Sequence, residues 1–397
     1  MTIKDKIWYH IYHPLRYATE SARCRMEGRK RSEIISVLLV SDLAVYTSEQ
    51  QFAALLSHRD HLRRRLGIVL NHKFVKDVLD APSRKLKGYH VIIVKLAFWT
   101  GETSAFDIVT QLRRKCGSAK FIYFDGDDDV CISWGRLLEK VDLYVKKQIF
   151  ARRADYQRQF VGKSNLTDYV ARIHAVSFED NIIPKSGIVE PRYLHKVALG
   201  YSVATDDRII RLFRDERVRP SRKKDIDIVC RAASQPESWI HPLRATVIEA
   251  LSGLTDRYRL LLPDKRVTHT QYNDEMRRSR ICISPFGYGE VCWRDFEAII
   301  FGCLLVKPDM SHLRTEPDIF IPGETYVPVK WDFSDLAETC SRYLVDDSAL
   351  NRITRRAYDV LANYYESHGL VDCFQRLLAR IDIEPRSVVR RDRQGLL

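Results

Sequence analysis

Two charged side chains, Arg294 and Glu297, lie three residues apart in the segment RICISPFGYGEVCWRDFEAIIFGCLLVKP of residues 280–308. Because residues three apart share one face of a helix, a helix here would present both side chains from the same side. A guanidinium can donate two parallel hydrogen bonds to phosphate oxygens, and a carboxylate can accept hydrogen bonds from two neighbouring hydroxyl groups. The pair therefore has the chemistry to hold a phosphorylated molecule that carries hydroxyl groups. A plain surface ion pair is the alternative interpretation.

The elements predicted around this pair are a buried strand, a loop with two glycines, a helix and a second strand. The strands are expected at residues 281–284 and 304–306, and the helix at residues 292–301, with Gly287 and Gly289 in the loop. In a parallel α/β layout, ligands bind beyond the carboxyl ends of the strands. Glycines let the backbone approach a bound group, and the free N–H groups at a helix start attract an anion. The segment therefore predicts a phosphate site where the loop meets the helix.

The string RDFEAIIFGCLLV, residues 294–306, resembles the nucleotide-sugar-binding segment of glycosyltransferases with two facing Rossmann-like domains, the GT-B type. It is most similar to the exostosin-like members, in which R-x-x-E-A is followed by G-C and an apolar strand. The resemblance covers roughly residues 225–346. Retaining GT-B families carry two glutamates with seven residues between them, whereas Glu290 and Glu297 have six between them, so Glu290 departs from that pattern.

This resemblance implies an α/β fold of two Rossmann-like domains that face a cleft. It also implies transfer of a sugar from a nucleoside diphosphate-sugar donor to a hydroxyl of a saccharide or lipid-linked acceptor, as in polysaccharide or glycolipid synthesis. Arginines would neutralise the leaving diphosphate, so no cofactor is expected and a divalent metal is not favoured. The donor-binding residues expected are Arg231, Arg244, Ser284, Gly287, Tyr288, Gly289, Arg294 and Glu297, and Arg294 is also expected to be catalytic.

Asp42 is the candidate catalytic base in the first half of the chain. It follows the apolar run IISVLLV of residues 34–40, so it is expected at the carboxyl edge of a strand, where the cleft should lie. A carboxylate in that place can take the proton of an acceptor hydroxyl. An aspartate after a strand also commonly caps a helix, and both interpretations stay open.

A second acidic cluster follows the predicted strand KFIYFD of residues 120–125, which runs into GDDD. Several carboxylates on a short loop suit Mg²⁺ or Mn²⁺. The GT-A class of glycosyltransferases holds its metal with such a D-x-D motif, so Asp125 and Asp127 would be the ligands in a metal-dependent, GT-A-like enzyme. That class lacks the R-x-x-E segment. A solvated loop with no metal is the other interpretation.

Short and nearly continuous apolar runs recur along the chain, as in strands that are covered on both faces of a parallel sheet. In the first half they are residues 34–40, 66–70, 90–96, 120–125 and 141–147. The predicted division is a basic amphipathic segment at 1–30, a Rossmann-like acceptor domain at 31–215, a Rossmann-like nucleotide-sugar domain at 225–346, and C-terminal helices with a basic tail at 347–397. The resemblance implies that these helices cross back to the first domain, and a simple C-terminal cap is the alternative.

Length and cysteine usage limit the class of protein. A chain of 397 residues suits two domains, each with its own core. It contains no apolar run long enough to span a membrane, and its first residues lack the apolar core of a signal peptide. The nine cysteines are dispersed without metal-binding spacing, which indicates reduced thiols and a cytoplasmic location.

The formal charge of +13 predicts an anionic partner. No nucleic-acid-binding motif is present, so a nucleic-acid partner is not expected. An anionic membrane surface, met through residues 1–30 at the inner face of the membrane, would explain the charge. Packing of that segment on the first domain is the alternative. A non-catalytic protein that binds polyanions is the remaining alternative for the whole chain.

Overall fold

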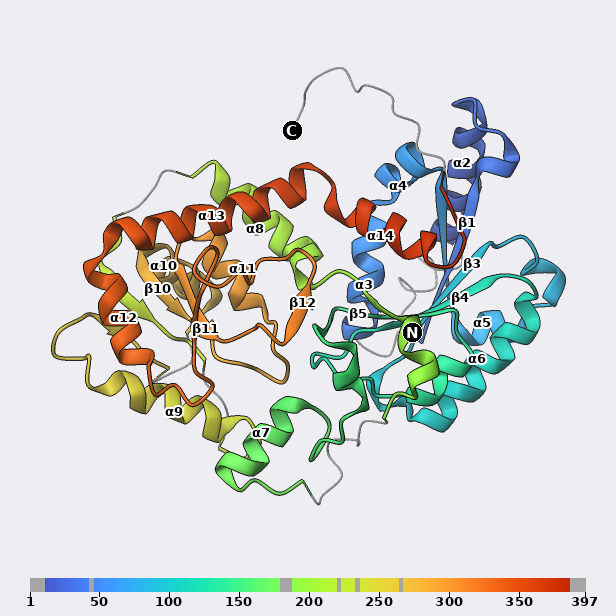
Figure 1. The fold of residues 1–397 in the computed structure, drawn as a ribbon. Coiled ribbons are helices and arrows are strands. Elements are labelled where there is room, and N and C mark those ends of the chain that lie inside the picture. The colour runs from blue at the N-terminus through green and yellow to red at the C-terminus, as the bar shows by residue number, and fades with distance from the viewer. Residues whose placement is uncertain are drawn as a thin grey trace.

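The computed structural model describes residues 11–42, 46–178, 188–219, 223–232, 236–263 and 267–385. Two parallel sheets form the centres of two domains, which lie side by side in Figure 1. The first sheet has the order β2-β1-β3-β4-β5-β7. Its strands are β1 (Ile35–Ser41), β2 (Ile68–Phe74), β3 (Val91–Lys95), β4 (Lys120–Asp125), β5 (Leu143–Lys146) and β7 (Val197–Leu199).

The second sheet has the order β13-β11-β10-β8-β9, and all of its pairs are parallel. Its strands are β8 (Ile226–Val229), β9 (Leu260–Leu261), β10 (Ser279–Ile283), β11 (Leu304–Pro308) and β13 (Val327–Val329). Both sheets are parallel with helices between their strands, so the predicted α/β fold of two Rossmann-like domains is confirmed.

Helices cover both faces of each sheet. Those of the first half are α3 (Tyr46–Ser57), α4 (Arg59–Leu66), α5 (Val75–Asp80), α6 (Glu102–Cys116) and α7 (Asn165–His174). Those of the second half are α8 (Asp207–Arg217), α9 (His241–Ser252), α10 (His269–Arg278), α11 (Trp293–Ile300), α12 (Leu336–Val345), α13 (Asp347–Glu366) and α14 (Gly369–Ala379). Ile209 and Phe213 of α8 lie in the apolar core of the second sheet, so this helix packs with the second domain although most of it lies before residue 215.

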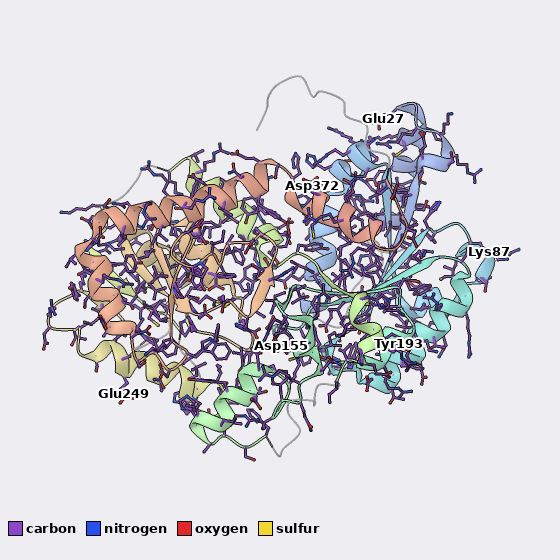
Figure 2. The ribbon with its side chains drawn as sticks, viewed as in Figure 1. Glu27, Lys87, Asp155, Tyr193, Glu249 and Asp372 are labelled. Atoms are coloured by element: carbon purple, nitrogen blue, oxygen red, sulfur yellow. The ribbon has the colours of Figure 1, made fainter. Side chains whose placement is uncertain are left out.

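The chain returns to the first domain at its C-terminal end. Phe374 and Leu378 of α14 belong to the apolar core between the first sheet and α3. Asp372 of the same helix, labelled in Figure 2, pairs with Arg65 of α4 at 2.8 Å. The crossing of the C-terminal helices is therefore confirmed, and the simple cap is not what the structure shows.

The N-terminal helix α2 (His13–Met26) packs on the first domain. Glu20 is buried and forms an ion pair of 2.8 Å with Arg59, and Cys24 packs against Val69 of β2. This favours the packed-helix interpretation for residues 13–26. The membrane-anchor interpretation also depends on residues 1–10, which lie outside the described residues. The predicted basic tail, from about residue 386, lies outside them as well.

Two further findings bear on the sequence expectations. All nine cysteines are free thiols. Among the helices of the described ranges, none combines the length and the apolar character that a membrane span requires.

Candidate functional site

The loops that follow β4 and β10 meet between the two domains. A Cβ added to Gly289 would overlap the carbonyl oxygen of Asp128, so the two main chains are in direct contact and only glycine permits it. Beside this contact, β6 (Gln148–Phe150) pairs in antiparallel fashion with β12 (Leu313–Thr315), and Figure 1 shows β12 between the two sheets. The sequence predicted that Gly289 would approach a bound group. The structure instead places it against the other domain.

Arg294 lies in the first turn of α11, and its side chain is half-buried. Its Nη1 atom is shielded from solvent and has no hydrogen-bond partner in the part of the chain that the structure describes. No ion pair joins Arg294 to Glu297, although both are described, so the surface ion-pair interpretation is wrong. A guanidinium with a shielded nitrogen that lacks a hydrogen-bond partner is suited to an anion that comes from outside the chain.

A second guanidinium lies beside Arg294. Arg244 of α9 donates a hydrogen bond from Nε to the carbonyl oxygen of Phe286 at 3.2 Å, and a Cβ on Gly287 would lie 3.3 Å from its Nη2. Partial burial and the nearby charge of Arg294 lower the pKa of Arg244. Two guanidinium groups held close enough to repel each other, next to a glycine loop and a helix start, form a strongly positive place in the fold.

Glu297 follows Arg294 by one turn of α11. The hydroxyl of Tyr272, from α10, donates a hydrogen bond of 2.6 Å to its carboxylate. Burial raises the pKa of Glu297, while the Tyr272 hydrogen bond and the charge of Arg294 act in the opposite direction. Glu297 is thus a positioned, half-buried carboxylate near Arg294. Tyr272 was missed by the sequence interpretation, since nothing in QYNDEMRRSR marks it as a partner of Glu297.

The start of α11 is fixed by a buried polar group. Asp295 accepts hydrogen bonds from Ser284 Oγ at 2.6 Å and from Lys307 Nζ at 3.1 Å, and its other oxygen accepts from the backbone N–H of Cys292 at 2.9 Å. Ser284 has no exposed surface. The structure therefore gives Ser284 a supporting position behind the helix, in place of the predicted position on the wall of a donor pocket.

Two other predicted donor-binding residues occupy different surroundings. Tyr288 is 59% exposed, and its hydroxyl lies 3.2 Å from Ser238 Oγ, so it stands at the rim of the loop. Arg231 makes a forked pair with Glu275 through Nε and Nη2, at 2.8 and 2.9 Å, and donates to the carbonyl oxygen of Leu262. These bonds commit Arg231 to the fold, so of the two arginines expected to assist Arg294, the geometry favours Arg244.

Asp42 lies at the carboxyl end of β1, as its place in the sequence predicts. Its Oδ2 accepts a hydrogen bond of 2.6 Å from the backbone N–H of Ala97, which follows β3. This bond ties together the ends of two neighbouring strands at the cleft edge of the sheet. Its role as a catalytic base stays a prediction. The helix-cap alternative depends on residues 43–45, which lie outside the described residues.

The acidic loop after β4 is neutralised by ammonium groups. Asp125 pairs with Lys146 at 3.2 Å and accepts from the Tyr144 hydroxyl at 2.7 Å, and Asp127 pairs with Lys163 at 2.6 Å. Although burial acts against ionisation, Lys163 and Lys146 lower the pKa of Asp127. No group of three or more metal-ligating side chains exists within the described ranges. Since lysines already occupy these carboxylates, the geometry does not favour the GT-A-like metal site.

Two more groups near the domain contact were not selected from the sequence. Glu290 is fully buried, and neither of its carboxylate oxygens has a hydrogen-bond partner among the described residues. His312 Nε2 lies 3.9 Å from it. Lys95 is 3% exposed at the end of β3. The sequence could have indicated Lys95, because it is a charged residue near the end of the apolar run HVIIVKL. A charge at the carboxyl end of such a strand lies at the cleft edge of the sheet.

No protein-family model and no curated protein sequence matches the chain. Among solved structures, a glycosyltransferase from Rickettsia africae ESF-5 is 11% identical, with a TM-score of 0.46 over 88% of this chain and 99% of that chain. An alpha-glucosyltransferase in complex with UDP and a 13-mer DNA is 8% identical, with a TM-score of 0.45 over 85% and 100%. TarM is 10% identical, with a TM-score of 0.42. The match covers 72% of this chain and 54% of the TarM chain. At these similarities the fold assignment rests on the sheet topology itself.

Proposed function

We propose that the protein is a GT-B type glycosyltransferase that moves a sugar from a nucleoside diphosphate-sugar donor to a hydroxyl of a saccharide or lipid-linked acceptor. One observation carries the proposal. The guanidinium of Arg294 has a buried Nη1 without a partner in the described residues, next to Arg244 and at the start of α11. A diphosphate would supply the missing acceptor atoms and relieve the repulsion between the two arginines.

In the proposed reaction, the acceptor oxygen forms a bond to the anomeric carbon as the bond from that carbon to the diphosphate breaks. Negative charge develops on the leaving diphosphate, and preorganised donors aimed at that charge lower the barrier. Arg294, Arg244 and the N–H groups at the start of α11 are the donors available there. The acceptor proton would pass to Asp42. Glu297, held by Tyr272, would accept hydrogen bonds from the ribose hydroxyls.

Three finer features are part of the proposal and rest on the sequence alone. The string RDFEAIIFGCLLV supports an exostosin-like donor domain, and with it a role in polysaccharide or glycolipid synthesis. The charge of +13 supports attachment to an anionic membrane surface from the cytoplasmic side. No cofactor besides the donor itself is proposed.

A thermal-shift panel of nucleotides tests the proposal directly. UDP, GDP, ADP, CMP and inorganic phosphate would each be added to the full chain, since a ligand that binds only the folded state raises the melting temperature. We expect a shift with UDP or GDP. The shift should be reduced in Arg294→Lys, because a point charge cannot bridge two phosphate oxygens, and kept in Arg355→Lys, which changes an exposed arginine of α13. A panel without any shift, or equal shifts in all three proteins, would refute the proposed function.

A further inference from the structure

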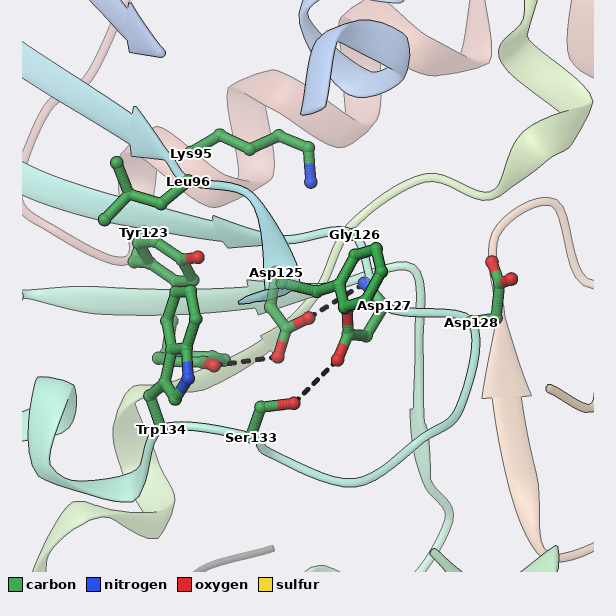
Figure 3. A pocket seen from close by; sticks show the side chains of 11 residues that line it. Lys95, Leu96, Tyr123, Asp125, Gly126, Asp127, Asp128, Ser133 and Trp134 are labelled. Carbon is green, nitrogen blue, oxygen red and sulfur yellow. Dashed lines mark hydrogen bonds between the residues drawn. The ribbon is translucent and has the colours of Figure 1, made fainter. Parts of the chain in front are cut away.

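A small cavity lies at the carboxyl ends of β3 and β4, on the side of the first domain that meets the β10 loop. Its volume is about 80 Å³, and Lys95, Tyr123, Asp125, Gly126, Ser133 and Trp134 are among the residues that line it. Figure 3 shows these side chains around the space, with Tyr123 and Trp134 forming one wall. About 10–15 Å³ of such volume holds one water molecule and about 150 Å³ holds a benzene ring, so the cavity has room for several water-sized groups. It can therefore admit a hydroxyl or hydroxymethyl substituent but not a whole sugar ring.

Two polar side chains, one that lines this cavity and one beside its lining residue Gly126, are not satisfied by the fold. Lys95 forms no hydrogen bond or ion pair with any described residue, and the side-chain amide of Gln51, on α3, lacks a partner at both Oε1 and Nε2. Both residues are 3% exposed. A Cβ on Gly126 would overlap Lys95 Nζ and lie 3.1 Å from Gln51 Oε1, so the two side chains converge on one point of the backbone. Buried polar groups are nearly always hydrogen-bonded, and two that converge unpaired indicate a ligand.

The neighbouring carboxylates are paired with ammonium groups but keep free lone pairs. Asp125 is paired with Lys146, and Asp127 with Lys163 and Ser133. They can therefore accept hydrogen bonds from hydroxyl groups without attracting a cation strongly. The cavity thus offers a donor, at Lys95, and acceptors within a short distance of one another, and the Gln51 amide lies beside Gly126 of its lining. A group that both donates and accepts hydrogen bonds, such as a sugar hydroxyl, matches this set.

Aromatic rings continue from the cavity to the surface. Phe98, which lines the cavity, is 50% exposed, and its neighbour Trp99 is 54% exposed, with their ring centroids 4.7 Å apart. Exposed aromatic side chains at the mouth of a pocket with a few convergent polar groups are typical of a binding site. A molecule with hydroxyl groups on its edge and C–H groups on its face can place a hydroxyl group in the cavity and its C–H face on the aromatic rings.

The position of the cavity relates it to the donor site. Residues 126–128 line the cavity, and the main chain of Asp128 also touches Gly289 of the β10 loop. Arg294 and Arg244 flank the same β10 loop. A molecule that rests in the cavity is therefore next to the loop at which we propose the donor to bind.

We propose that the Lys95 cavity, together with Phe98 and Trp99, is the subsite for one sugar unit of a saccharide acceptor. One hydroxyl or hydroxymethyl group enters the cavity and bonds to Lys95 and Gln51, while the ring lies on the exposed aromatic side chains. This inference rests on the proposed function, which it deepens by naming a saccharide and not a lipid or a peptide as the group that the first domain recognises.

Intrinsic tryptophan fluorescence tests the proposal, because Trp134 lines the cavity and the exposed Trp99 packs on Phe98, which also lines it. Glucose, galactose, mannose, N-acetylglucosamine and glucuronate would each be titrated into the full chain without nucleotide. We expect at least one sugar to bind. Its affinity should fall about tenfold or more in Lys95→Met and in Trp99→Ala. Lys120→Met, at the opposite end of β4, is the matched control and should keep the affinity of the native protein.

Melting-temperature shifts with UDP and GDP, measured on the same variants, separate the two proposals. Sugar binding that depends on Lys95 and Trp99, with unchanged nucleotide shifts, supports the subsite. If a nucleotide binds but none of the five sugars does, the subsite is refuted and the proposed function stands. If a sugar binds equally well to Lys95→Met and Trp99→Ala, it binds elsewhere and the subsite is likewise refuted. If neither nucleotides nor sugars bind, both proposals fail together.

Discussion

Gly289 of the second domain lies against the main chain of Asp128 in the first, at the point where the loops after β10 and β4 meet. The same β10 loop holds Glu290 and leads into α11 with Arg294. Asp128 is itself fixed by Lys147, whose ammonium pairs with its carboxylate at 2.8 Å. The contact that sets the spacing of the two domains is thus only a few residues from the candidate donor site. A change in this contact should therefore alter nucleotide binding.

Gly289→Ala should damage both stability and nucleotide binding. Its methyl group would overlap the Asp128 carbonyl oxygen, so one of the two loops must move. Overpacking of this kind costs about 1–3 kcal/mol. We expect a lower melting temperature and a smaller UDP or GDP shift. Gly253→Ala is the control, since a Cβ there meets nothing within 4 Å and the backbone φ is −70°, and it should change neither quantity. Equal behaviour of the two variants would contradict the tight contact.

Turnover should survive treatment with EDTA. The carboxylates of Asp125 and Asp127 are already paired with Lys146 and Lys163, and arginines are available for the leaving diphosphate. Initial rates with and without EDTA, on protein freed of metal beforehand, measure this. Activity that disappears with EDTA, returns with Mn²⁺ and is lost in Asp127→Asn would contradict this prediction. It would indicate a metal-dependent reaction at the acidic loop.

The sheets were predictable because parallel strands that are buried on both faces carry nearly unbroken apolar runs. The run of residues 34–40 became β1 (Ile35–Ser41), and residues 120–125 coincide with β4. The pairing of β6 with β12 was not predictable. These strands are three residues each and more than 160 residues apart, and their pairing depends on how the two domains dock.

The candidate site was predictable as a segment and not residue by residue. The spacing of Arg294 and Glu297 and the loop before them follow from the sequence pattern. The ion pair of Arg231 with Glu275 does not, because it joins the segment after β8 to α10 and needs the three-dimensional arrangement of both. The same holds for Ser284, whose hydroxyl is used by Asp295, and for the convergence of Lys95 and Gln51 on Gly126.

The charge of Lys95 should make sugar binding depend on pH. Burial lowers the pKa of Lys95 to about 8, although Asp125 acts in the opposite direction. If the ammonium form donates to the sugar, affinity should fall as the pH rises through about 8, and this fall should be absent in Lys95→Met. Fluorescence titrations between pH 6.5 and 9.5, a range of about 1.5 units on each side, check it. A flat profile in the native protein would exclude the ammonium of Lys95 from the interaction.

Lys95 should also make stability depend on pH, but stability should rise with pH where sugar affinity falls. Between about pH 8 and the usual lysine pKa near 10.4, the unfolded chain holds a proton on Lys95 that the folded protein has lost. The free energy of unfolding of the native protein should therefore rise with pH in this window, relative to Lys95→Met. The difference is at most about 3 kcal/mol. Urea unfolding of both proteins at pH 7.5 and 10 measures it, and parallel pH dependences would show that burial leaves the Lys95 pKa near its usual value.

Glu297 and Tyr272 should act as one unit in donor binding. Glu297→Gln keeps the shape of the side chain but removes the charge that would accept the ribose hydroxyls. A hydrogen bond to a charged group contributes roughly 1.5–3 kcal/mol, so the affinity for the preferred nucleoside diphosphate should fall about ten- to a hundredfold. The Tyr272 hydrogen bond lowers the pKa of Glu297, so Tyr272→Phe should raise that pKa. As the pH is lowered, the variant should therefore lose its nucleotide affinity at a higher pH than the native protein does. Isothermal titration calorimetry across pH 5 to 8 measures both, a window that lies above the usual glutamate pKa of about 4.3.

The double variant separates a functional pair from a structural one. If Tyr272 acts through the carboxylate of Glu297, then Tyr272→Phe should have little further effect on affinity once Glu297 is Gln, and the shift in the pH profile should vanish. Tyr358→Phe is the matched control: its ring stacks on Phe213 of α8, and the substitution should leave affinity and pH profile unchanged. Fully additive losses, or unchanged affinity in Glu297→Gln and Tyr272→Phe alike, would show that the pair only supports the packing of α10 on α11. The ribose contact would then have to be sought in other residues of the β10 loop.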